Sequence, residues 1–115
     1  MLTRARFRKL ALSLDGVTEV PHLARTAFRT RRAIIATLPP DGRSANLKLN
    51  LELQATVVAA APHAFSPVPG GWGRLGYTTV DLQVVTEAVL VSALKEAHWL
   101  ASAPPPRKKA KKPRP

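Results

Sequence analysis

Histidines, carboxylates and serines could carry acid–base, metal or nucleophilic chemistry, but their spacing in this chain supports none of these. His22, His63 and His98 stand far apart, and the chain contains no cysteine. A closed metal site draws four ligands, usually from short spacings, so none is expected. The seven carboxylates are scattered, and the serines lack the setting of a hydrolase nucleophile. We therefore expect a non-enzymatic protein without a metal or cofactor.

A literal G-x-G-x-x-G motif occupies residues 71–76, the spacing found in dinucleotide-binding loops. In those loops a strand precedes the motif and a helix follows it, so that phosphate meets the helix N-terminus. Here Pro67 and Pro69 precede it, and residues 77–80 are β-branched or aromatic, as in a strand. We interpret the segment as an extended arm, a glycine-rich turn and a returning strand.

The charge is strongly unbalanced, with 18 Lys and Arg against 7 Asp and Glu, a formal net charge of +11. Six of the cations lie in residues 103–115, so residues 1–102 hold 12 cations against 7 anions. Such a surplus attracts polyanions, namely nucleic acid, acidic proteins or an anionic membrane surface, without distinguishing among them.

Other features of composition bear on location. No run of about 18 apolar residues is present, so we expect no transmembrane segment. The N-terminus carries arginines without the apolar segment of a secretory leader. Because cysteine is absent, disulfides and thiol catalysis are excluded. We expect a cytoplasmic protein with one folded domain.

Capping residues and hydrophobic periodicity predict the secondary structure. Thr3, Asn50 and Thr86 are placed to cap three helices. Alternation predicts that Ala45, Leu47 and Leu49 point inward, with Ser44, Asn46 and Lys48 outward, and that Ile34, Ala36 and Leu38 share one face. Pro21 marks an extended link. The predicted elements are helices over residues 3–13, 51–60 and 86–101, strands over 26–30, 33–38 and 44–49, and one or two strands within 65–82.

This order predicts a two-layer α+β domain over residues 1–102, with an antiparallel sheet and helices on one side, α-β(3)-α-β(2)-α. Residues 103–115 contain prolines, like charges and no apolar residue larger than alanine. Such a composition cannot bury a core, so we expect a disordered basic tail.

Seven segments carry a resemblance to a known family: residues 12–17, 21–22, 28–29, 36–42, 46–49, 65–74 and 76–82. In this order and at this spacing, they resemble the MmcQ/YjbR family over about residues 5–101. The resemblance implies an antiparallel sheet with helices on one side, and a DNA-binding function assigned partly by analogy with the double-wing domain of a phage transcription factor. Tyr77 stands where the family commonly has Trp, and Arg31–Arg32 replaces a turn that usually contains Gly.

Two functional hypotheses follow. The first is a nucleic-acid-binding protein that contacts DNA phosphates through basic turns, an open sheet face and the tail, with little base readout. The second is a chaperone-like protein-interaction module that accepts a partner strand and forms a homodimer. Trp72 either stacks on a base or folds over the core edge. The candidate nucleic-acid-binding residues are Arg29, Arg31, Arg32, Arg43, Lys48, Trp72, Arg74, Arg107, Lys108, Lys109, Lys111, Lys112 and Arg114.

Overall fold

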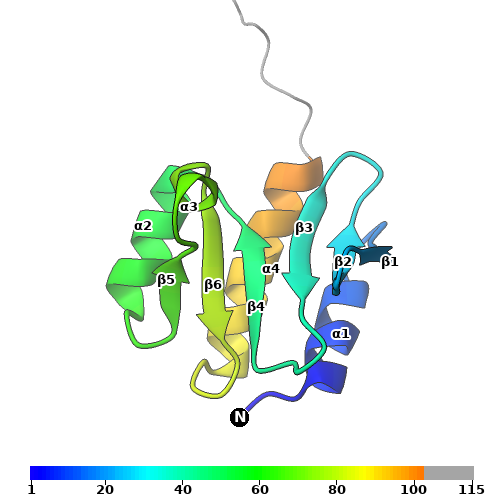
Figure 1. Ribbon diagram of the computed structural model, residues 1–115, viewed down its shortest axis with the longest axis horizontal. Helices are drawn as coiled ribbons and strands as arrows, with labels where there is room; N and C mark the ends of the chain where they lie inside the picture. The colour runs from blue at the N-terminus through cyan, green and yellow to red at the C-terminus, as the bar shows by residue number, and fades with distance from the viewer. Residues whose placement is uncertain (103–115) are drawn as a thin grey trace, which may run out of the picture.

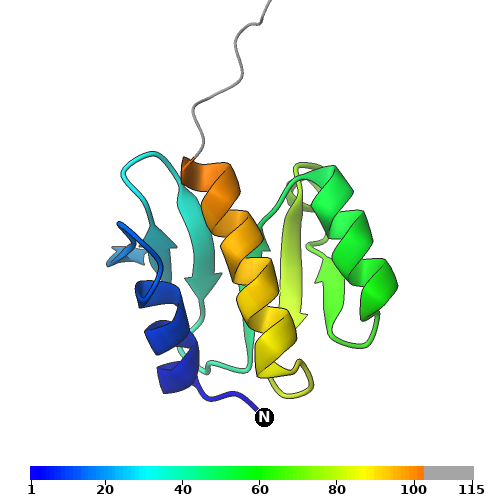
Figure 2. The same cartoon turned by 180° about the vertical axis from the view of Figure 1, so that it is seen from behind.

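The structure, a computed structural model, describes residues 1–102 and shows a six-stranded antiparallel sheet with three long helices packed on one side (Figures 1 and 2). The strand order across the sheet is β1-β2-β3-β4-β6-β5. The predicted α+β class is confirmed. The elements are α1 (Arg4–Leu12), β1 (Thr18–His22), β2 (Arg25–Arg29), β3 (Ile34–Leu38), β4 (Ser44–Lys48), α2 (Leu51–Ala60), β5 (Phe65–Pro67), α3 (Gly71–Arg74), β6 (Tyr77–Asp81) and α4 (Glu87–Ser102).

The three long helices begin where their capping residues predict. The Thr3 hydroxyl accepts a hydrogen bond from the backbone N–H of Arg6 at 3.0 Å, and the Asn50 side chain accepts one from Leu53 at 2.8 Å. The Thr86 hydroxyl caps α4 by accepting a longer hydrogen bond, 3.3 Å, from the backbone N–H of Val89. Each cap satisfies a backbone donor that has no partner within the helix.

The hydrophobic core lies between the sheet and α1, α2 and α4. Phe28, Leu47 and Leu94 are fully buried in it. The burial of Leu47 confirms the alternation predicted for residues 44–49. The rings of Phe7 and Phe28 meet edge to face at 5.6 Å, which joins α1 to β2.

A bulge in β3 changes the predicted face of one residue. Ala36 pairs with Phe28, but Ile34 pairs with Arg29, so Ile35 is an extra residue on its strand. Ile35 points into the core, and Ile34 lies on the opposite face of the sheet. The expectation that Ile34 shares a face with Ala36 and Leu38 is therefore wrong, because a bulge breaks the two-residue period.

Two further elements differ from the predicted order. The extended link at Pro21 is an edge strand, β1, paired with β2. Proline is tolerated there because an edge strand has one side without partners. The glycine-rich segment contains one helical turn, α3, where a turn was predicted. The chain thus has four strands before α2 and a short helix between β5 and β6.

No helix within residues 1–102 combines the length and apolar character needed to cross a membrane. The predicted basic tail, with Arg107, Lys108, Lys109, Lys111, Lys112 and Arg114, lies outside the described residues.

Candidate functional site

The face of the sheet turned away from the long helices is the candidate site (Figure 1). Alternate residues of each strand point to this face, and they differ sharply from the apolar residues of the core. β2 contributes Arg25 and Arg29, and β4 contributes Asn46 and Lys48. β6 contributes Tyr77 and Thr79. We call this surface the open face.

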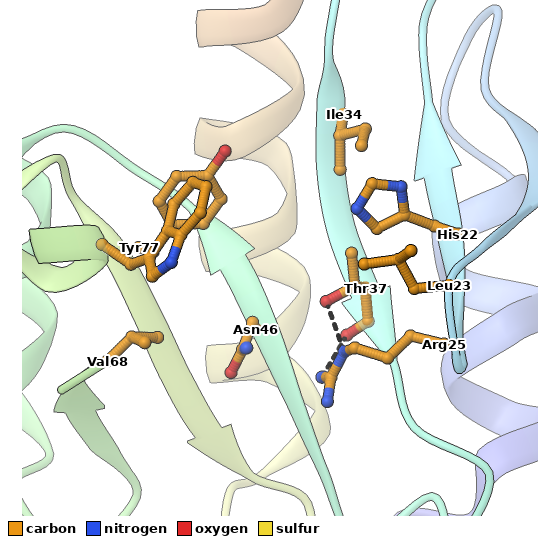
Figure 3. Close-up of a pocket in the computed structure, with 9 residues that line it drawn as sticks. His22, Leu23, Arg25, Ile34, Thr37, Asn46, Val68 and Tyr77 are labelled. Carbon is orange, nitrogen blue, oxygen red and sulfur yellow. Dashed lines mark hydrogen bonds between the residues drawn. The ribbon is translucent and has the colours of Figure 1, made fainter. Parts of the chain in front are cut away.

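A hollow of about 320 Å³ lies in the middle of the open face. Figure 3 shows its two banks, with Tyr77 and Val68 on one side and His22, Leu23 and Arg25 on the other. The floor comes from the strands between them: Ile34 and Thr37 of β3, and Asn46 of β4. Trp72 completes the lining. Most of these residues are distant in sequence and meet only through sheet pairing.

An aromatic pair forms one bank. The rings of Trp72 and Tyr77 meet edge to face, with centroids 5.2 Å apart and an angle of 89° between the planes. The ammonium of Lys48 lies 5.2 Å from the Tyr77 centroid and also donates hydrogen bonds to the carbonyls of Leu49 and Leu75. Trp72 remains 61% exposed. Its ring is therefore held in orientation and still open to solvent, rather than folded over the core edge.

The opposite bank is the tip of the β1–β2 hairpin. Leu23 is 96% exposed and has φ of 58°, a conformation that L-residues seldom adopt. Arg25 donates from Nε to the Thr37 hydroxyl at 2.9 Å and from a terminal nitrogen to the Thr37 carbonyl at 3.3 Å. Burial lowers the pKa of the Arg25 guanidinium, and Asp41 opposes this. An arginine nevertheless stays charged, so the hairpin places a fixed cation at the hollow.

Gln54 fixes the aromatic bank from behind. This buried residue of α2 donates from Nε2 to the carbonyls of Gly73 and Tyr77, each at 3.0 Å, and reaches the Thr78 hydroxyl at 3.3 Å. These bonds tie α2 to α3 and to the start of β6. The amide thus positions the segment that carries Trp72.

Close packing explains two glycines of the G-x-G-x-x-G motif. A Cβ on Gly73 would clash with the backbone carbonyl of Val68, and one on Gly76 would clash with that of Leu49. Gly76 also has φ of 103°. A Cβ on Gly71 would have no neighbouring atom within 4 Å. The motif therefore serves a tight backbone crossing, and α3, with four residues, is too short to offer a phosphate site.

The structure separates the predicted basic residues into groups. Arg29, Lys48 and the exposed Arg31–Arg32 turn lie toward one end of the sheet. The short helix α3 lies at the same end but beside β5 and β6, across the sheet from that turn (Figure 1). Arg43 lies at the other end, in the β3–β4 turn. Arg74 is exposed beside Leu51 of α2, in a different hollow from Trp72. Positions two apart on a helical turn point in different directions, so Trp72 and Arg74 line separate hollows.

Acidic residues neutralise cations on the helix side. Arg6 of α1 pairs with Glu87 of α4, with contacts of 2.6 and 2.8 Å. Arg8 pairs in the same bidentate way with Glu19 at 2.7 and 2.9 Å. The hydrogen bonds from the guanidinium groups lower the pKa of both glutamates and raise those of both arginines. These are the two ion pairs within residues 1–102, and neither lies on the open face.

Sequence reasoning missed Arg25, His22 and the hollow itself. Arg25 has the same strand parity as Arg29, and that signal could have placed it on the same face. The contribution of His22 and Leu23 depends on β1, which was interpreted as a link. Among residues 1–102, no three histidine, aspartate or glutamate side chains gather closely enough to hold a metal ion.

Comparisons with known proteins concern the fold. No family model matches the sequence, and no curated protein matches it. A solved structure superimposes with a TM-score of 0.74 at 20% identity, covering 97% of this chain and 83% of the other. It is the crystal structure of Deinococcus radiodurans protein DR2400, described as a DUF419 domain, a domain of the YjbR/MmcQ-like group. The chain thus shares its fold with a DUF419 domain protein.

Proposed function

We propose that this chain is a non-enzymatic nucleic-acid-binding protein of the MmcQ/YjbR family, and that the open face is its binding surface. The observation that carries the proposal is that one face combines three cations, Arg25, Arg29 and Lys48, with an aromatic pair whose tryptophan ring is exposed. Cations neutralise phosphates, and aromatic rings stack on bases.

The distribution of charge supports this face over the helix side. On the helix side, Glu19 and Glu87 take up two arginines of α1. On the open face, among the described residues, the cations of β2 and β4 hydrogen-bond to neutral oxygens and remain available to an anion. The Thr30 hydroxyl donates to the Ala101 carbonyl at 3.4 Å. This bond places the end of α4 beside the Arg31–Arg32 turn. The segment with six cations, residues 103–115, comes directly after this helix in the sequence.

The alternative, a protein-interaction module that accepts a partner strand, has less support. Both edge strands contain proline, Pro21 in β1 and Pro67 in β5, and β5 has three residues. Short edges with proline are typical of sheets that avoid further pairing. An acidic protein bound through charge stays an alternative ligand for the basic surface. The absence of cysteine suits the reducing cytoplasm, where we propose that the protein acts.

Titration of the full chain with labelled DNA at several salt concentrations tests this function. We expect binding whose log K falls linearly with log salt. Replacing both Arg31 and Arg32 with alanine should weaken binding to every sequence about equally, because phosphate contacts carry no base information. Lys9→Ala with Lys95→Ala is the matched control, since these exposed lysines lie on α1 and α4. Equal losses in both double variants, or no binding at low salt, would contradict the proposal.

A further inference from the structure

We propose that the hollow of the open face seats an unstacked base of single-stranded nucleic acid against the Trp72 ring. This inference rests on the nucleic-acid binding proposed above and specifies the strand type. In a duplex the flat faces of the bases are stacked on one another, so a protein surface outside the duplex contacts mainly phosphates. A single strand can turn a base out of its stack and place it in a hollow.

The aromatic bank supplies the stacking surface. Trp72 is 61% exposed, yet its edge-to-face contact with Tyr77 and the underlying Gln54 bonds hold it in place. A ring that is already oriented loses little rotational freedom on binding. Because every base has a π-face, such stacking tolerates any sequence. The aromatic bank thus gives affinity for single strands without base specificity.

The floor and the opposite bank supply polar groups for the rest of the nucleotide. Arg25 uses two of its nitrogens on Thr37, which fixes the guanidinium and leaves further N–H donors for a phosphate. Asn46 accepts a hydrogen bond from the Thr79 hydroxyl at 2.9 Å through Oδ1. Within residues 1–102 its Nδ2 has no hydrogen-bond partner, so the amide retains donors for a base edge. Apolar side chains, Ile34 and Val68, line the remaining surface.

The size and composition of the hollow agree with this ligand. A volume of about 320 Å³ lies at the lower end of the range for small-molecule pockets, about 300–1,000 Å³. Its lining combines aromatic and aliphatic carbon with a few fixed polar groups, as such pockets do. A chain of nucleotides could enter along the face, because the hollow opens between the β1–β2 hairpin and α3 (Figure 3).

The two tryptophans provide a matched test. Trp99 of α4 is 64% exposed, almost the same as Trp72, but it lies on the helix side. The full chain is titrated by fluorescence anisotropy with a labelled oligothymidine of about 10 nucleotides, within the usual site sizes of about 4–16. A hairpin duplex with the same number of phosphates is the comparison ligand. Titrations are repeated with Trp72→Ala, Trp72→Phe and Trp99→Ala.

The wild-type chain should bind the single strand more tightly than the hairpin. Trp72→Ala should lower single-strand affinity by about 5- to 150-fold, the equivalent of one lost stack. It should change hairpin affinity by less than about twofold. Trp72→Phe should retain most of the wild-type affinity for the single strand. Trp99→Ala should change the affinity for neither ligand.

A second readout does not depend on removing the ring. In Trp99→Phe the sole tryptophan is Trp72, and in Trp72→Phe it is Trp99. Adding the single strand should quench the tryptophan fluorescence of the first variant strongly and that of the second only slightly. If the chain binds both ligands equally and Trp72→Ala weakens neither, base seating is wrong while nucleic-acid binding stands. If neither ligand binds at low salt, both proposals are wrong.

Discussion

The side chain of Gln54 donates a hydrogen bond to the carbonyl of Gly73 at 3.0 Å, which joins the buried face of α2 to the helical turn that carries Trp72. The same amide nitrogen reaches the carbonyl of Tyr77 at 3.0 Å. One buried side chain therefore supports both members of the aromatic pair.

Replacing Gln54 with leucine should lower the free energy of unfolding by about 1–3 kcal/mol, because it removes two hydrogen bonds that this buried amide donates to backbone carbonyls. Urea denaturation measures this loss. Gln83→Leu, at an exposed position, is the control and should change stability by less than about 0.5 kcal/mol. A similarly small effect at Gln54 would mean that its hydrogen bonds do not hold α3.

The two glycines of α3 should respond differently to alanine. Gly73→Ala forces a Cβ against the Val68 carbonyl and should cost about 1–3 kcal/mol. Gly71→Ala meets open space and should be neutral or stabilising by up to about 1 kcal/mol, since alanine favours a helix. Thermal unfolding of both variants compares them in the same turn. Equal effects would show that the backbone crossing at Gly73 is looser than described.

Acidification should weaken the ion pairs on the helix side. The pKa of Glu19 and that of Glu87 are lowered by their arginines, so both pairs stabilise the fold above the unfolded glutamate pKa of about 4.3. That stabilisation is lost as the pH falls through the lower, folded values. Glu19→Gln with Glu87→Gln should flatten the stability profile below about pH 4.3, measured by denaturant unfolding at each pH. Glu96→Gln should leave the profile unchanged; an equal flattening there would argue against the pairs.

Deleting residues 103–115 tests the predicted tail, which lies outside the described residues. If its six cations all contact phosphate, the slope of log K against log salt should become shallower by about 5. The titration uses duplex DNA with the full and the shortened chain, and circular dichroism checks that folding is retained. An unchanged slope would exclude the tail from binding.

Local rules in the sequence predicted much of the fold. Caps such as Thr3 and Asn50 act within four residues, and the alternation of 44–49 reports which side of β4 is buried. Both signals come from neighbouring residues in the sequence, so they can be recognised without knowing which segments pack against one another. For the same reason the three long helices and the inward positions Ala45, Leu47 and Leu49 were predicted correctly.

The remaining features depend on contacts between distant segments. The bulge at Ile35 exists because β2 and β3 change register, and no residue in β3 signals it. Pro21 lies in an edge strand, but proline usually indicates the end of a strand. Only the sheet pairing shows that one side of β1 needs no hydrogen-bond donor. The hollow needs the β1–β2 hairpin on one side of β3 and β4, and the bank formed by α3 and β6 on the other. Sequence reasoning therefore found the basic residues but not their arrangement around the hollow.

Backbone amide NMR shifts test whether nucleic acid binds the open face. The ¹⁵N-labelled full chain is titrated with unlabelled oligothymidine, without any mutation. We expect the largest shift changes at Arg25, Asn46, Lys48 and Thr79, with small changes at Leu53 of α2 and Glu96 of α4. Changes concentrated on α2 and α4, with the open-face amides unmoved, would contradict it.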